Sequence, residues 1–341
     1  MDPPAVRLGD FFLRYIAISW KLCCSFVVKC DILIVELWKG VVLVGYLFAL
    51  LAVAAGVTKG YCGKRTSGSV ATFGEAMVAN SVRMSLCVVI GFLILAVRGD
   101  LGLLRLDGMA LLITVGSGIF SAAFVVTWLI AVKRSAYMML DVFLLLGSLI
   151  PMLLCQWLFG ERITLPQWAG LIVLLAAVFI MCSYSAGLKG KLSLSGLGLL
   201  LLCALSCGLA DFCQKAYTQL YPGADAAVFN FYTYLAAGVL LIICRLLTPM
   251  IEESKSRSVR ATVIPIFGYV AIMAFCLFAN SFFKVQAAGF LTASQLFPFT
   301  QGVGIAVSTI MAAIFFREKI TPRCVVGLVL AFAGLIIMNM L

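Results

Sequence analysis

Histidine is absent from this 341-residue chain, and charged residues make up only 11% of it. Without histidine the chain has no Ser–His or Cys–His nucleophile pair, no histidine metal ligand and no histidine proton relay. The 13 cysteines form no CxxC pair, and most lie inside apolar runs, where cysteine packs as a small hydrophobic residue. The GxxxxGK[ST] pattern of nucleotide-hydrolysing loops is also missing. We therefore predict no catalytic residue, no metal site and no cofactor.

Apolar residues make up 64% of the chain, and its mean hydropathy is +1.14. Soluble domains hold roughly half apolar residues, whereas a bilayer-spanning helix needs about 20 of them in succession. Long unbroken runs favour helices over a membrane barrel of alternating strands. The sequence thus predicts an all-α, multi-pass integral membrane protein of the cell (inner or plasma) membrane, with the lipid bilayer as its surroundings. The net charge of +11 comes mainly from basic residues at the ends of apolar runs, so we expect no nucleic-acid partner.

One stretch of the chain occurs twice. Residues 159–181 read FGERITLPQWAGLIVLLAAVFIM, and residues 316–338 read FREKITPRCVVGLVLAFAGLIIM. The two align without a gap when shifted by 157 residues. Each copy holds the end of one apolar helix, a short charged turn and a second apolar helix. A repeat of this kind indicates that the chain consists of two similar halves.

Ten membrane-spanning helices are expected, five in each half. Because five is an odd number, the second half enters the membrane in the opposite orientation, which makes an inverted repeat with a substrate site between the halves. The predicted organisation is an N-terminal extension (1–37), a first repeat (38–186), a linker (187–195) and a second repeat (196–341). The extension is interpreted either as a helix in the membrane interface or as sequence upstream of the true start. The expected helices are 38–59, 75–97, 108–132, 135–159, 166–186, 196–219, 226–248, 262–285, 290–316 and 322–341.

The two acidic turns, FGERIT at 159–164 and FREKIT at 316–321, resemble the hallmark of the drug/metabolite transporter superfamily in its ten-helix, EamA-like form. The resemblance covers about residues 38–341. It implies an alternating-access carrier whose central cavity is lined by the first, third and fourth helices of each half, with the second helices as gates. The last helix of each half would lie at the periphery, for packing or for a homodimer. One departure is Asp141, which stands where the repeat alignment places Pro298.

Polar side chains inside the expected helices are the candidate substrate contacts, because a charge at membrane depth is costly and often functional. Asp211 and Lys215 share a helix face, so they either neutralise each other or line the cavity, with one changing partner or protonation during transport. Pro298 frees a backbone carbonyl and is the predicted hinge. For the other residues, snorkelling, packing or interface roles are the alternatives. The candidate substrate-binding residues are Asp141, Asp211, Lys215, Asn80, Arg83, Asn280, Lys284, Gln295, Gln301, Trp128 and Tyr137.

Other charged residues are placed outside the membrane core. Lys59 is expected at the end of the first helix, among the basic residues of a loop. Counted over all loops, the basic residues favour an orientation opposite to the one that the resemblance implies, so the orientation stays open. Glu161 and Glu318, the glutamates of the two acidic turns, are expected to cap the helix that follows each turn.

The preferred function is secondary active transport of a small polar metabolite, amino-acid-like or similar, driven by protons or by exchange for a counter-substrate. A cavity with both signs of charge and many amides fits such a small-molecule substrate better than a lipophilic cation. Three alternatives stay open: an exporter of cationic compounds, a nucleotide-sugar-type antiporter that uses Arg83, Lys215 and Lys284, and a non-transporting scaffold. A membrane-embedded enzyme is disfavoured by the lack of histidine and of an exposed catalytic loop.

Overall fold

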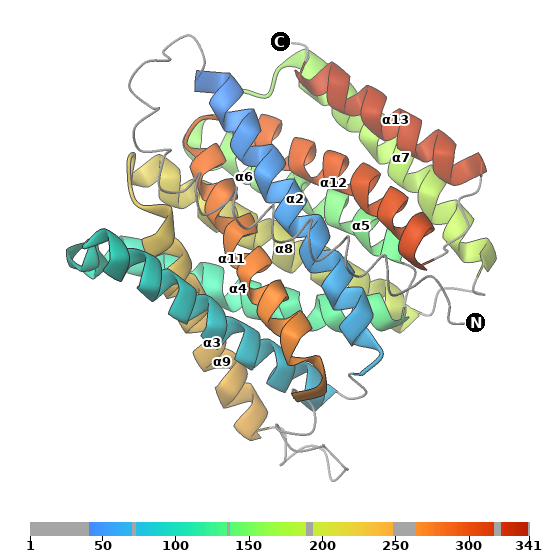
Figure 1. Ribbon diagram of the computed structural model, residues 1–341. Helices are drawn as coiled ribbons and strands as arrows, with labels where there is room; N and C mark the ends of the chain where they lie inside the picture. Colours follow the sequence, from blue (N-terminus) through green and yellow to red (C-terminus); the bar gives the residue numbers. More distant parts are fainter. Residues whose placement is uncertain are drawn as a thin grey trace. The chain divides into compact units, whose positions relative to one another are not determined.

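A computed structural model describes residues 41–69, 73–134, 137–188, 194–247, 264–316 and 322–339. Every regular element in these ranges is a helix, which confirms the all-α class (Figure 1). Seven of the described helices are long and apolar enough to cross a membrane, and three shorter apolar helical segments accompany them. The predicted extension 1–37 lies outside the described residues, and so does Glu318. The helices are α2 (Val41–Ser67), α3 (Phe73–Arg98), η1 (Leu101–Leu104), α4 (Gly108–Arg134), α5 (Tyr137–Gly147), α6 (Leu149–Phe159), α7 (Leu165–Leu188), α8 (Leu194–Leu220), α9 (Ala226–Leu247), η3 (Ile264–Ile266), α11 (Phe267–Ala288), α12 (Ala293–Phe316) and α13 (Pro322–Asn339).

Residues of the two predicted halves make similar contacts within the unit Gly45–Leu341. Asn80 of α3 donates a hydrogen bond from Nδ2 to the carbonyl of Val125 on α4 at 3.1 Å. Asn230 of α9 donates in the same way to the carbonyl of Phe278 on α11 at 3.4 Å. In addition, α3 packs against α9, and α7 lies beside α13 (Figure 1). The boundaries between the two halves stay a prediction.

The first spanning helix is longer than expected. We predicted an end at residue 59, but α2 continues to Ser67. Tyr61 and Cys62 are buried against neighbouring helices, so packing keeps the chain helical where basic residues suggested a loop. Lys59 therefore lies within a helix, partly buried, and its predicted place in a loop is wrong.

The single helix expected over 135–159 consists of two helices, α5 and α6, which meet at Ser148. Pro151 explains the break, because it has no N–H to donate and its ring crowds the carbonyl of Gly147, four residues earlier. The hydroxyl of Ser148 donates to the carbonyl three residues before it, at 2.7 Å. Pro298, by contrast, lies inside the continuous helix α12, so its hinge role stays a prediction.

Glycines mark the closest helix crossings. A methyl group built on Gly147 of α5 would lie 2.5 Å from the carbonyl oxygen of Ala204 on α8, and one built on Gly208 of α8 would collide with the backbone of Gly147. On α4, a methyl group on Gly118 would lie 2.7 Å from a backbone carbonyl of α9. These distances leave no room for a side chain, so small residues set how closely α4 and α5 approach α8 and α9.

The turn between α6 and α7 shows how the repeated motif is built. Gly160 has a φ of +67°, the left-handed conformation with which many helices end. The N–H of Thr164 donates to Oε1 of Gln167 at 2.9 Å, which is one half of a capping box at the start of α7. Glu161 does not cap α7 as we expected, because its carboxylate turns towards α8 and α12. There it accepts hydrogen bonds from Gln219 of α8 and from the N–H of Ala293 of α12.

Candidate functional site

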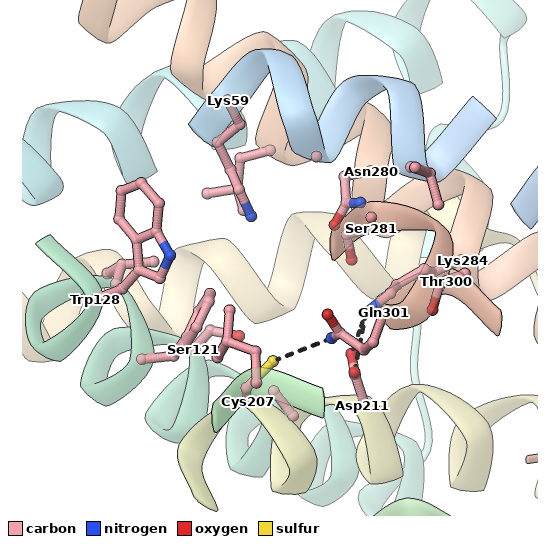
Figure 2. A pocket seen from close by; sticks show the side chains of 18 of the residues that line it. Lys59, Ser121, Trp128, Cys207, Asp211, Asn280, Ser281, Lys284, Thr300 and Gln301 are labelled. Atoms are coloured by element: carbon pink, nitrogen blue, oxygen red, sulfur yellow. Dashed lines mark hydrogen bonds and ion pairs between the residues drawn. The ribbon is translucent and has the colours of Figure 1, made fainter. Parts of the chain in front are cut away.

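A cavity of about 130 Å³ opens between α2, α4, α5, α8, α9, α11 and α12 (Figure 2). Except for α9, these are the first, third and fourth helices of the two predicted halves. A site needs roughly 10–15 Å³ to hold one water molecule, so the cavity has room for a solute of roughly ten non-hydrogen atoms. Its polar lining includes Lys59, Ser121, Asp211, Gln214, Asn280, Ser281, Lys284, Thr300 and Gln301.

Asp211 of α8 and Lys284 of α11 form an ion pair in the cavity wall. The ammonium Nζ of Lys284 lies 2.7 Å from Oδ1 and 2.9 Å from Oδ2 of Asp211. Both side chains are less than a tenth exposed, so the two charges neutralise each other away from water. The expected pairing of Asp211 with Lys215 is therefore wrong. Lys215 shares a helix with Asp211, but its ammonium group is held elsewhere.

Lys215 belongs to a second polar group, which we call the Glu161 cluster: Glu161, Lys215, Gln219 and the N–H of Ala293. Lys215 Nζ donates to the carbonyl of Ala288, the last residue of α11, at 2.8 Å and to that of Leu291 in the following loop at 2.7 Å. It also lies 3.2 Å from Oε1 of Glu161. Glu161 also accepts hydrogen bonds from Gln219 Nε2 and from the N–H of Ala293, each at 2.8 Å. The cation thus meets a helix C-terminus and the carboxylate meets a helix N-terminus, where the backbone dipoles favour each of them.

Lys59 of α2 is a charged cavity residue that is absent from the candidates predicted from the sequence. Figure 2 shows its side chain pointing into the cavity. Its Nζ lies 5.6 Å from the centre of the Phe124 ring, and among the described residues no oxygen accepts a hydrogen bond from it. A signal was available, because the repeat aligns residues 61–64 with 212–215, which lie inside an expected helix. The first helix should by the same logic have continued past Lys59.

Amides from three helices complete the polar lining. Asn280 of α11 donates to a backbone carbonyl of α2 at 2.7 Å. Gln301 of α12 directs Nε2 towards the sulfur of Cys207 at 3.9 Å. Gln214 of α8 donates from Nε2 to the hydroxyl of Ser281 at 3.1 Å, while its Oε1 is buried without a partner among the described groups. The lining therefore offers donors and acceptors from α8, α11 and α12, held in place by bonds to neighbouring helices.

Comparison with known proteins identifies the second half. Residues 194–340 match the model of the EamA-like transporter family. These residues belong to that family. A solved structure, titled only "Crystal structure of protein", shares the fold over 89% of this chain and 97% of its own, with a TM-score of 0.63 and 16% sequence identity. No match was found among curated proteins.

The EamA-like family is one of membrane transporters with an all-helical fold, in agreement with the apolar helices described above. The resemblance seen in the acidic turns is therefore confirmed over residues 194–340. The apolar helices and this match together make the chain a multi-pass membrane protein. Among the described residues, no three metal-ligating side chains come together.

Two candidate residues, Asn80 and Arg83 of α3, lie outside the cavity. They border a separate space of about 10 Å³, too small for a solute. Asn80 is bonded to the backbone of α4. Arg83 is only 2% exposed, and its Nε has no hydrogen-bond partner among the described groups. The structure thus separates both residues from the cavity that they were expected to line.

The remaining candidates have mixed positions. Trp128 of α4 lines the cavity. Gln295 accepts a hydrogen bond at Oε1 from the N–H of Thr292 at 3.2 Å, so it caps the start of α12 instead of facing the cavity. Asp141 and Tyr137 belong to α5, but their side chains lie outside the described set, and their role stays a prediction.

Proposed function

We propose that the chain is a secondary active transporter that moves a small polar organic metabolite by alternating access, with proton coupling or exchange. The observation that carries the proposal is the polar cavity, whose lining comes from both predicted halves. A site between two repeats stays accessible while one half rocks against the other. The buried pair Asp211–Lys284 adds charges of the kind that mark substrate or proton paths inside membranes.

The cavity favours a small polar solute over the alternative substrates. An exporter of cationic compounds needs a carboxylate that is free to meet the cation, whereas Asp211 is already held by Lys284. A nucleotide sugar exceeds the space of about 130 Å³ several-fold. It was also expected to use Lys215, which is engaged in the Glu161 cluster. A solute of amino-acid size meets both the volume and the mixture of amides and charges.

Uptake by purified protein in sealed liposomes tests the proposal. The panel consists of radiolabelled amino acids, monocarboxylates, nucleobases and sugars, each offered with and without a pH gradient and with and without the same solute preloaded inside. We expect saturable uptake of one class above that of protein-free liposomes, accelerated by the gradient or by preloading. Uptake that responds to neither condition contradicts secondary active transport, and release of a chemically altered product indicates an enzyme.

Asp211→Asn separates the two coupling modes. If Asp211 carries the transported proton, the variant loses the acceleration by a pH gradient but keeps exchange of preloaded solute. If the carrier works by exchange alone, wild type and variant respond equally to preloading and neither responds to the gradient. Unchanged uptake with unchanged pH dependence in the variant rules out a proton-coupling role for this carboxylate.

A further inference from the structure

The charges of the described residues that line the cavity do not balance. Its described lining residues carry two ammonium groups, on Lys59 and Lys284, and one carboxylate, on Asp211. Asp211 is bound through both of its oxygens to Lys284. The positive charge of Lys59 is therefore left over, inside a space where charged side chains normally pair with an opposite charge.

The surroundings of Lys59 differ sharply from those of Lys284, although both ammonium groups lie over a phenylalanine ring. Lys284 Nζ is 5.8 Å from the centre of the Phe297 ring and has the Asp211 carboxylate as its partner. Lys59 Nζ is 5.6 Å from the Phe124 ring and has no oxygen partner among the described residues. A ring face offsets only part of the lost hydration of an ammonium ion. The N–H groups of the Lys59 ammonium are thus directed into the cavity without an oxygen partner among the described residues (Figure 2).

We propose that Lys59 binds the carboxylate of the transported solute, so that the cavity takes a small monocarboxylate or a zwitterion with one carboxylate. This inference rests on the transport function proposed above and names its substrate class. In either solute, a single carboxylate supplies one negative charge as the partner of the Lys59 ammonium group, whereas a phosphate group brings an additional negative charge at neutral pH. The volume of about 130 Å³ also suits a carboxylic acid of roughly ten non-hydrogen atoms.

Thermal unfolding of the detergent-purified protein tests the inference with matched probes. Lactate is compared with methyl lactate and glutamine with glutaminamide, because each pair differs in the presence of a carboxylate. Glycerol phosphate and tetraethylammonium represent phosphates and cations. We expect a carboxylate to raise the Tm of the wild type and its ester or amide derivative to leave the Tm unchanged, since a ligand that binds only the folded state stabilises it.

Variants of Lys59 test whether this side chain is responsible for carboxylate binding. Lys59→Met should weaken carboxylate binding on the order of 10- to 100-fold, the loss expected for a charge-assisted hydrogen bond. Lys59→Arg should retain part of the binding. Arg105→Met removes the same charge from an exposed position between η1 and α4 and should bind like the wild type. Without ligand, Lys59→Met should unfold at the same or a higher temperature, because an unpaired and partly buried charge is lost.

Several results overturn the inference: equal carboxylate binding by Lys59→Met and wild type, stronger binding of the ester or amide derivatives or of glycerol phosphate, or no carboxylate effect on the wild type. A lower Tm of ligand-free Lys59→Met also overturns it, since Lys59 would then have a partner within the protein. Liposome uptake separates the two proposals. Uptake that does not depend on Lys59 contradicts only this inference, whereas carboxylate binding without any uptake contradicts the transport function.

Discussion

The Glu161 cluster and the central cavity both contain ammonium and carboxylate groups, but these groups differ in how many hydrogen-bond partners they have. In the cluster, Glu161 accepts from three donors and Lys215 contacts three oxygens. In the cavity, only Lys284 and Asp211 are matched, while Lys59 has no oxygen partner among the described residues. Both regions lie among apolar helices, so burial alone does not explain the difference. In the cluster the charged groups are engaged by other groups of the protein, so they are not available to a solute. In the cavity the ammonium group of Lys59 is available to one.

Two lysines that were equivalent candidates in the sequence have different roles in the structure. Lys215 and Lys284 were both expected to contact substrate. Lys215 instead ties α8 to the end of α11 and, through Glu161, to the start of α12. Lys284 stays at the cavity wall. Variants of the two regions should therefore differ: changes in the cluster should affect stability, and changes in the cavity should affect solute binding.

Lys284→Met should have the largest effect on stability. It leaves the carboxylate of Asp211 buried without its partner, which costs about 3–5 kcal/mol. Thermal unfolding in detergent measures the loss. The double variant Asp211→Leu with Lys284→Met should recover most of it, because replacing a whole buried pair by apolar groups is often neutral. A double variant as unstable as the single one would show that the pair stabilises the fold beyond its own charges.

Glu161→Gln should destabilise the protein by about 1.5–3 kcal/mol, because hydrogen bonds that involved a charged acceptor become neutral ones. The change should lower the Tm and leave solute preference unaltered, since the cluster does not line the cavity. Gln219→Ala is the control, because it removes one exposed donor to the same carboxylate and should cost less. A change in solute preference in Glu161→Gln would refute the structural role of the cluster.

Gly208→Ala tests whether close packing holds α8, the helix that carries Asp211, in place. The added methyl group would collide with the backbone of Gly147, and such overpacking costs typically about 1–3 kcal/mol. Gly198→Ala on the same helix is the matched control, because a methyl group there meets nothing within 4 Å. That control should gain roughly 0.5–1 kcal/mol from lower backbone entropy in the unfolded chain. Equal behaviour of the two variants in thermal unfolding would contradict the tight crossing.

Tyr221→Phe should have the smallest effect. The hydroxyl of Tyr221 donates to Oδ2 of Asp107 at 2.5 Å, outside the spanning helices, and this bond holds the pKa of Asp107 below its usual 3.8. A lowered pKa in the folded state adds stability above the usual pKa, and that stability is lost as the pH falls through the folded pKa. A slight Tm difference between wild type and variant near neutral pH should therefore vanish in strong acid. A difference that persists or grows on acidification would contradict this assignment.

Much of the fold could be predicted because its signals are local. Apolar runs marked the spanning helices, and the repeated acidic turn marked two similar ends. The errors arose where packing overrode a local signal. Lys59 and the basic residues after it suggested a loop, but buried neighbours such as Tyr61 keep α2 helical. In the expected helix 135–159, the kink follows from Pro151, whose effect the apolar pattern concealed.

The candidate site was harder to predict than the fold. Asp211, Asn280, Lys284, Gln301 and Trp128 do line the cavity, because polar residues inside apolar helices turn inwards. Asn80 and Gln295 carry the same side-chain amide as Asn280 and Gln301, yet they form hydrogen bonds to nearby backbone groups and do not line the cavity. Sequence spacing along one helix does not distinguish these two uses, since the partner comes from another helix.

By itself, the sequence determined the membrane class, the helical content, the repeated acidic turn and the family of the second half. Each of these follows from residue types that are close along the chain. Only the tertiary structure decided which charges meet. Lys215 is four residues from Asp211 in the sequence, yet Asp211 binds Lys284, 73 residues away, because the packing of α8 against α11 brings those side chains together. The same packing leaves Lys59 directed into the cavity with its charge unmatched among the described residues.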